Sequence, residues 1–305
     1  MNILMTGGTG FIGKTVSAHL IRKGHQVTVL TRRPPGRAGG IEGISYLQGD
    51  PTQKGKWQEA VPASDIIINL AGASIFSRWS EEQKRTIRES RIHTTRNLVE
   101  ALPLRPDRAM TLLSASAVGY YGSRGEEELT EEAPPGKGFL AKVCEDWEGE
   151  ASKAGEKGIR VAMMRFGIVL GEEGGALGQM VPLFRHYLGG PIGSGRQWFS
   201  WIHLQDLEEA ILFLMSHPEV SGPVNFCTPH PLRNQDLARA LGKALHRPSF
   251  LRVPAFALRM LLGEFGSVLL EGQRVIPRKL LAGGFTFRYP EVEEALRDLA
   301  FRLRL

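Results

Sequence analysis

Three glycines near the start of the chain have the spacing of a phosphate-binding turn. Gly7, Gly10 and Gly13 lie in the stretch TGGTGFIG, between an apolar run and a segment with helical spacing. Such a turn needs backbone angles open to glycine, and a pyrophosphate must approach the N–H groups at a helix N-terminus closely. The pattern predicts a dinucleotide site, with a ligand-free glycine turn as the alternative. The residues expected to contact the dinucleotide are Gly7, Thr9, Gly10, Phe11, Ile12 and Gly13.

The end of the next apolar run indicates which dinucleotide would bind. Thr31 stands where an NAD site carries an acid, Arg32 and Arg33 follow it, and no Asp or Glu occurs from residue 25 to residue 41. A carboxylate at this point holds the ribose 2′-hydroxyl and repels a 2′-phosphate, whereas a guanidinium pairs well with a phosphate. The sequence therefore predicts NADP(H) as cofactor, with a solvated basic loop as the alternative.

Strand-like and helix-like segments alternate through the first half of the chain. The expected helices are residues 10–24, 80–102 and 139–155, and Ser80 is an N-cap followed by acidic residues. The expected strands are residues 2–6, 25–31, 44–50, 65–72, 109–116 and 159–167. This alternation predicts an α/β fold, a Rossmann-type doubly wound parallel sheet with helices on both faces.

The composition changes after about Gly171, where glycines and aromatic residues become frequent. We expect residues 1–170 to form the NADP-binding domain, and residues 200–228 to return to it. Residues 171–199 and 229–305 are expected to form a smaller, mostly helical lobe that binds substrate over the carboxyl ends of the strands. The apolar stretch 253–272 could lie on a membrane surface, but its charges are few, so a core helix pair broken by a glycine is favoured.

The overall composition excludes several classes of protein. Of the 305 residues, 42% are hydrophobic and 23% charged, and the two cysteines show no metal-ligand spacing, so we expect no metal site and a reduced, cytoplasmic location. No leader pattern and no apolar run of membrane-spanning length is found, so no membrane association is expected. The net charge of +6 is spread along the chain without a nucleic-acid-binding signature, so no nucleic-acid partner is expected.

Several motifs together resemble those of extended short-chain dehydrogenases/reductases, the relatives of nucleotide-sugar epimerases and dehydratases. They are TGGTGFIG, GD at residues 49–50, NLAGAS, SASAVGYYG, RFGIVLG and FSWIHLQDL, in that order. The resemblance extends to about residue 230. The tail PRKLLAGGFTFRYPEVEEALRDL is similar to that of one subgroup, the epimerase-family or atypical reductases, whose substrate is unassigned.

Carried over by position, the resemblance implies roles for individual residues. Ser116 aligns with the catalytic serine, and Lys142 aligns with the lysine that holds the nicotinamide ribose. Asp50 is implied to lie by the adenine, Arg165 to close the sixth strand near the site, and His203 to join the two lobes together with Trp201 and Asp206. The segment implied to pass along the cofactor is Leu70, Ala71 and Gly72.

Two positions depart from the pattern of the resembled family. Gly138 stands four residues before Lys142, where relatives carry the tyrosine that moves the proton, and Arg91 stands in place of a helix asparagine. A positioned acid or base typically contributes 10²–10⁴-fold to such a step. The candidates to replace the tyrosine are Tyr120, Tyr121 and His203, while Cys144 is expected to face inward. Packing with structural hydrogen bonds is the alternative for all three, and Ser116 could be only a strand-end hydroxyl.

The candidate substrate residues are arginines and tryptophans near the mouth of the expected cleft: Arg78, Trp79, Arg196, Trp198 and Trp201. An arginine beside an indole suits a planar or anionic ligand, although packing between the lobes would explain the aromatics equally well.

The first functional hypothesis is an NADP(H)-dependent oxidoreductase or epimerase that acts on a small-molecule substrate, anionic or like a nucleotide sugar. The second is a non-catalytic NADP(H)-binding redox sensor or scaffold. A structural protein that has lost the cofactor is poorly supported, because the glycine turn and the basic strand end are both intact. The resemblance also leaves open a homodimer formed through the helices 80–102 and 139–155.

Overall fold

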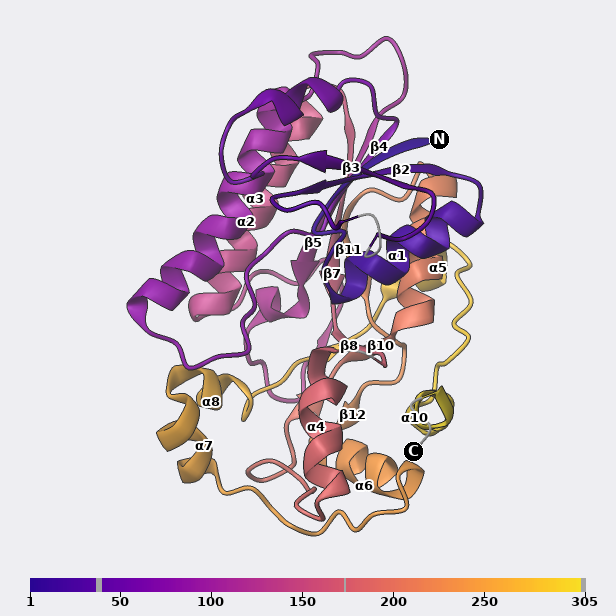
Figure 1. Cartoon of the computed structure of the whole chain (residues 1–305). Coiled ribbons are helices and arrows are strands. Elements are labelled where there is room, and N and C mark those ends of the chain that lie inside the picture. Colours follow the sequence, from indigo (N-terminus) through magenta and orange to yellow (C-terminus); the bar gives the residue numbers. More distant parts are fainter. Residues whose placement is uncertain (37–39, 173, 303–305) are drawn as a thin grey trace.

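A seven-stranded parallel sheet forms the centre of the computed structural model, which describes residues 1–36, 40–172 and 174–302 (Figure 1). The strand order is β11-β7-β5-β4-β1-β2-β3, so the chain starts in the middle and extends the sheet in both directions. This is the doubly wound arrangement that the alternation of strands and helices predicted, and the fold class is confirmed. The strands are β1 (Asn2–Thr6), β2 (Gln26–Thr31), β3 (Ile44–Gln48), β4 (Ile66–Asn69), β5 (Thr111–Ala117), β7 (Arg160–Phe166) and β11 (Gly222–Phe226).

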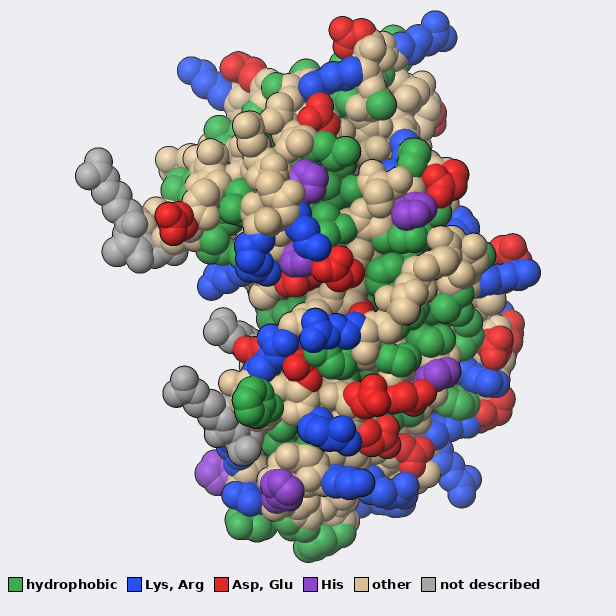
Figure 2. All heavy atoms as spheres, turned by 90° about the vertical axis from the view of Figure 1, so that its right-hand side faces the viewer, with side chains coloured by type: hydrophobic (Ala, Val, Ile, Leu, Met, Phe, Trp, Pro, Cys, Tyr) green, Lys and Arg blue, Asp and Glu red, His purple; other side chains and the backbone are tan. Residues whose placement is uncertain are grey.

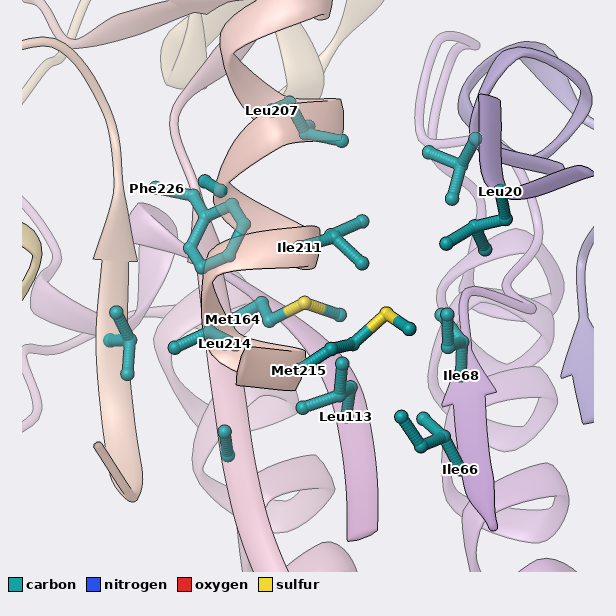
Figure 3. Close-up of a cluster of buried hydrophobic side chains, with 14 of the residues drawn as sticks. Leu20, Ile66, Ile68, Leu113, Met164, Leu207, Ile211, Leu214, Met215 and Phe226 are labelled. Carbon is teal, nitrogen blue, oxygen red and sulfur yellow. The ribbon is translucent and has the colours of Figure 1, made fainter. Parts of the chain in front are cut away.

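Helices cover both faces of this sheet. On one face lie α1 (Phe11–Arg22) and α5 (Leu204–Ser216), and on the other lie α2 (Glu81–Ala101) and α3 (Phe139–Glu156) (Figure 1). Apolar side chains of α5, such as Leu207 and Ile211, point toward the strands in Figure 3, where they meet Ile68 and Met164. Each of these four side chains is completely or almost completely buried. The sheet is therefore a rigid platform that fixes the ends of its strands.

A smaller lobe lies beyond the carboxyl ends of the strands (Figure 1). Its core is a cluster of apolar side chains that includes Phe184, Trp201, Leu237 and Leu296. The cluster joins α4 (Gly175–Arg185), α6 (Asn234–Ala244) and α10 (Val292–Arg302) to the short strands β8 (Ile168–Leu170), β9 (Trp198–Phe199), β10 (Trp201–His203) and β12 (Leu232–Arg233). The remaining elements are η1 (Lys56–Ala60), η2 (Val118–Tyr121), β6 (Glu128–Leu129), α7 (Ala255–Leu262), α8 (Glu264–Val268), β13 (Arg274–Val275) and α9 (Arg278–Ala282).

The apolar stretch 253–272 forms the short helices α7 and α8, which meet at Gly263 with φ at +61°. Phe265 is buried beside Trp79 and Ile87, whereas Phe256 and Met260 on α7 are exposed. A glycine break is therefore present, but only part of the pair packs into a core. No helix within the described residues is both long enough and apolar enough to cross a membrane.

Candidate functional site

The glycine turn joins β1 to α1 and leaves the N-terminus of the helix open. Gly10 is the N-cap, no side chain caps the helix, and its first turn carries no acid. Gly7 has φ at +69°, and a Cβ placed there would lie 2.6 Å from the carbonyl carbon of Leu70. A Cβ on Gly13 would lie 2.2 Å from the oxygen of Gly7. The turn is therefore possible only with glycine at these positions, and its free N–H groups fit a pyrophosphate.

The loop after β4 is held beside this turn by buried hydrogen bonds. The hydroxyl of Thr6 donates to Asn69 Oδ1 at 2.7 Å and accepts a bond from the Ala71 backbone N–H at 3.3 Å. Asn69 in turn donates to Thr95 at 2.8 Å and Ser114 at 3.2 Å. The structure thus brings Leu70, Ala71 and Gly72 next to the glycine turn.

The basic end of β2 lies one strand away from the turn, because β1 and β2 are hydrogen-bonded neighbours. The side chains of Arg32 and Arg33 are exposed, and the Arg33 backbone N–H donates to the hydroxyl of Thr31 at 3.4 Å. Asp50 follows the next strand, β3, and its Oδ1 accepts bonds from the backbone N–H and the hydroxyl of Thr52 at 2.9 and 2.7 Å. The residues assigned to the adenosine half of the cofactor therefore share one edge of the sheet.

A buried polar network connects Ser116 to residues of four neighbouring elements, α3, β7, η2 and β11. The Ser116 hydroxyl donates to Glu148 Oε1 at 2.6 Å, and Arg165 holds the same carboxylate through Nε and Nη2, both at 2.8 Å. Arg165 Nη1 also donates to the Tyr121 hydroxyl at 2.9 Å, and that hydroxyl donates to Asn225 at 2.7 Å. Charge-assisted, two-pronged bonds of this kind fix orientation strongly. The Ser116 hydroxyl therefore has one defined acceptor on α3.

The two tyrosines after Ser116 differ sharply in environment. Tyr121 is fully buried, and burial raises the pKa of its hydroxyl, which is already occupied by Arg165 and Asn225. Tyr120 is half-buried, and the Arg165 guanidinium lies 3.5 Å from the centre of its ring. Burial also raises the pKa of Tyr120, against the opposing effect of Arg165. Of the two, Tyr120 is the more exposed, and Arg165 is the member of the network that acts most strongly on its hydroxyl.

Lys142 lies on the outer side of α3, where its side chain is 64% exposed. Its Nζ pairs with Glu145 at 2.9 Å and Asp146 at 3.0 Å. The residues of α3 that face the end of β5 are Leu140, which lies against Gly119, and Cys144, whose thiol is near Ser116 and the Ala117 backbone. The structure therefore does not bring Lys142 together with Ser116, and the inward pair with four-residue spacing is Leu140 and Cys144.

Neither Gly138 nor Cys144 supplies an acid in place of tyrosine. Gly138 precedes α3 with φ at +103°, and a Cβ there would have no neighbour within 4 Å. Any other residue would be strained at this φ. Glycine is therefore required at position 138 by the backbone conformation and not by a lack of space for a side chain. The Cys144 thiol is protonated near neutral pH, because burial raises its pKa to about 11, but the side chain is buried and therefore closed off from a substrate.

His203 is an internal cap of α5. Its Nδ1 accepts a bond from the Gln205 backbone N–H at 3.1 Å, and the centre of its ring lies 4.1 Å from that of Tyr289, with the two rings tilted by 39°. Burial lowers the pKa of His203 to about 4, so the ring is neutral above that pH. The neighbouring carboxylate of Asp206 accepts bonds from the backbone N–H groups of Arg288 and Tyr289 at 2.7 and 3.0 Å. This segment ties α5 to the C-terminal part of the chain, and His203 does not join Ser116.

The five candidate substrate residues fall into two groups. Trp201 is fully buried in the core of the smaller lobe, and Trp79 is buried between Phe139 and Phe265. Arg78 and Arg196 are exposed, while Trp198 is half-buried with the Arg233 guanidinium 3.7 Å from its ring. Packing accounts for Trp79 and Trp201, and the other three have exposed surface that a ligand could contact.

A hollow of about 180 Å³ lies elsewhere, between α1 and α5 on the face shown in Figure 2. Charged side chains of both signs line it, among them Arg22, Glu208 and Arg288, together with His19. His19 already contacts Glu208 and Glu209, at 3.5 and 3.2 Å. Within the described part of the chain, no group of three His, Cys, Asp or Glu side chains could hold a metal ion.

Sequence reasoning missed Glu148, although it is the acceptor that orients Ser116. It follows Leu140 and Cys144 at four-residue steps, so all three share one face of α3. The signal that could have revealed Glu148 is an acidic residue at a helical position whose neighbours on the same face are apolar or buried.

The parallel sheet, the glycine turn at an uncapped helix and the serine at the end of β5 define a dinucleotide-binding protein of the extended short-chain type. The chain belongs to the NAD dependent epimerase/dehydratase family, whose profile matches residues 3–226. A domain of unknown function, DUF1731, matches residues 253–299. The resemblance stated from the motifs is confirmed.

Three relatives are similar over nearly the whole chain. The chloroplastic epimerase family protein SDR39U1 homolog of Arabidopsis thaliana is 43% identical over 98% of this chain and 86% of its own length. Epimerase family protein YfhF of Bacillus subtilis is 39% identical over 98% of both chains. The crystal structure of human epimerase family protein SDR39U1 with NADPH is 34% identical, with a TM-score of 0.86 over 99% of both chains.

Proposed function

We propose that this chain binds NADP(H) and is an oxidoreductase or epimerase of the extended short-chain type. The observation that carries the proposal is the pairing of an uncapped glycine turn with two exposed arginines at the end of the adjacent strand. The turn suits a pyrophosphate, and the arginines Arg32 and Arg33 suit a 2′-phosphate. Support comes from the human relative, which was crystallised with NADPH.

The proposed substrate is a small molecule that carries a carbonyl or carbinol carbon and an anionic group. Arg78 and Arg196 offer exposed guanidinium groups that pair with carboxylates or phosphates, and Trp198 offers an aromatic surface. In this proposal residues 171–199 and 229–305 form the substrate lobe, and residues 1–170 with 200–228 form the cofactor domain.

The protein residues that would act on the substrate oxygen are Ser116 and Tyr120. NADPH, when bound, supplies a hydride to a carbonyl carbon. Ser116 donates its only hydroxyl proton to Glu148, so the hydroxyl would have to turn from that carboxylate to the carbonyl oxygen in order to hold it. Tyr120 lies beside Arg165 and has the hydroxyl that could donate the proton to that oxygen. Because the pKa of Tyr120 is raised, its hydroxyl is protonated at neutral pH, as donation requires.

Leu140 and Cys144 on the inner face of α3 favour the second candidate, a redox sensor that binds NADP(H) without turnover. Neither side chain can move a proton to or from a substrate, because one is aliphatic and the thiol of the other is buried. The cofactor part of the site would then be retained without its chemistry.

Calorimetric titration with NADPH and NADH tests cofactor choice. We expect NADPH to bind at least about ten-fold more tightly, since a charge-assisted hydrogen bond contributes roughly 1.5–3 kcal/mol, and Arg32→Ala to reduce that ratio. Arg239→Ala is a matched control, because Arg239 is an exposed arginine on α6 paired with Asp236. Equal affinities for the two nucleotides in the unmodified protein contradict the assignment.

Turnover of NADPH against a panel of carbonyl compounds and nucleotide sugars separates the enzyme from the sensor. With a substrate in hand, Tyr120→Phe should lower kcat by roughly 10²-fold or more and leave NADPH affinity unchanged. NADPH binding without turnover across the panel supports the sensor.

A further inference from the structure

Arg91 on α2 lies against the loop that follows β4. Its Nη1 donates to the carbonyl oxygens of Ala73 at 3.1 Å and Ile87 at 2.8 Å. A Cβ on Gly72 would lie only 2.9 Å from Arg91 Cζ, so the guanidinium occupies the space that a side chain at Gly72 would need. Gly72 itself is exposed, which places this cation directly behind an open part of the loop.

This guanidinium is not neutralised by the protein. Within residues 1–36, 40–172 and 174–302, no carboxylate oxygen lies within 4.0 Å of it, while its neighbours on α2, Arg88 and Arg96, pair with Asp146 and Glu150 at 2.7 Å. Burial lowers the pKa of Arg91, and the group that acts on it electrostatically is the Cys144 thiol. That thiol is protonated at neutral pH, and an arginine stays charged, so the positive charge is uncompensated.

The position of Arg91 places the charge at one end of the proposed cofactor site. Leu70, Ala71 and Gly72 are the loop proposed to pass along the cofactor, and Cys144, which lies beside Ser116, is also close enough to Arg91 to interact with it electrostatically. Ser116 marks the end where the substrate oxygen would be held. Arg91 therefore belongs to the nicotinamide end rather than to the adenosine end, where Arg32 and Arg33 lie.

We propose that Arg91 makes the site selective for the reduced cofactor, which rests on the proposed binding of NADP(H). The oxidised nicotinamide ring carries a positive charge and the reduced ring does not, while the rest of the cofactor is the same in both forms. An uncompensated guanidinium at this end repels only the oxidised ring. The site near Arg91 thus binds the neutral dihydronicotinamide group more tightly than the charged nicotinamide group, so the protein binds NADPH in preference to NADP⁺.

The scale of the effect follows from Coulomb's law. A repulsion of about 1.4 kcal/mol between two like charges changes a dissociation constant ten-fold, and unit charges near a protein surface interact with energies of this order. We therefore expect NADPH to bind roughly ten-fold or more tightly than NADP⁺.

Dissociation constants of NADPH and NADP⁺ test the proposal in four proteins: the unmodified chain, Arg91→Met, Arg91→Lys and Arg88→Met. Arg91→Met should bring the two constants to within about three-fold, mainly by tighter binding of NADP⁺, and Arg91→Lys should keep most of the preference because it keeps the charge. Arg88→Met is the matched control, since Arg88 lies one turn earlier on α2, is exposed, and pairs with Asp146.

Binding of 2′,5′-ADP, which lacks the nicotinamide, is measured on the same proteins. It should be equal in the unmodified chain and in Arg91→Met, which shows that the fold and the adenosine site are intact. If Arg91→Met does not fold, the comparison is made with Arg91→Gln, which is also neutral.

Two results overturn the inference: no preference for NADPH over NADP⁺ in the unmodified chain, or an unchanged preference in the neutral variants while 2′,5′-ADP still binds. Failure of the proposed function looks different, because the unmodified chain would then bind neither the two cofactors nor 2′,5′-ADP.

Discussion

The change Glu148→Gln isolates the buried ion pair that orients Ser116. The Arg165 side chain is only 3% exposed and that of Glu148 only 10%, and they share two hydrogen bonds of 2.8 Å. Removing one charge of a buried pair leaves the other desolvated and uncompensated, which costs about 3–5 kcal/mol. We expect Glu148→Gln to lower the free energy of unfolding by about that amount, measured by urea denaturation at pH 7.

The same helix provides a matched control. Glu150 has a side chain that is 9% exposed, but its partners Arg96 and Lys153 are 47% and 53% exposed. Their charges stay solvated when the acid is neutralised, so Glu150→Gln should cost about 1 kcal/mol or less. In the double variant Glu148→Gln, Arg165→Met, neither charge of the pair is left without its partner, and we expect less destabilisation than the two single changes would give if added.

Equal, small losses for Glu148→Gln and Glu150→Gln would refute this reasoning, because they would show that the Arg165 charge is solvated in the folded protein. If a substrate is known, Glu148→Gln should also reduce kcat while NADPH affinity is kept, since Ser116 would lose its charged acceptor.

Two further predictions concern titratable groups. Because the Cys144 thiol is buried and its pKa is about 11, we expect it to react with a thiol reagent at pH 8 only at the rate of unfolding, measured by absorbance with and without urea. A fast reaction in the native protein would place the thiol at the surface. Because the pKa of His203 is lowered to about 4 in the folded protein, the unfolded chain binds more protons between about pH 6.5 and 4, and stability should fall as the pH drops through that range. His203→Gln should flatten this part of the profile of unfolding free energy against pH, and a profile as steep as that of the unmodified chain would contradict the assignment.

The fold could be predicted from the sequence because its signals are local. Glycine spacing, short apolar runs and an N-cap at Ser80 each depend on a few neighbouring residues, and Ser80 does accept the Gln83 backbone N–H at 3.1 Å. The glycine turn could also be predicted from the sequence, because the close contacts at Gly7 and Gly13 exclude other residues. The burial of Trp79 and Trp201 could not be predicted from the sequence, because the helices that cover these side chains come from distant parts of the chain.

The assignment of Lys142 shows why the candidate site was harder to predict than the fold. Successive helical residues are about 100° apart, so an alignment displaced by two positions turns a side chain to the opposite side of the helix. Lys142 lies two residues from both Leu140 and Cys144, and it faces Glu145 and Asp146 instead of Ser116.

The inner face of α3 therefore holds no cation near Ser116, whereas Arg91 on the neighbouring helix α2 carries a charge that no carboxylate of the described residues neutralises and that acts electrostatically on Cys144. A positive charge supplied by Arg91 of α2 would still act on a bound nicotinamide. The tyrosine and lysine that move the proton in the resembled family would nevertheless be absent from the inner face of α3. A protein of this kind keeps its cofactor specificity and depends on the end of β5 and on η2, through Ser116 and Tyr120, for any chemistry.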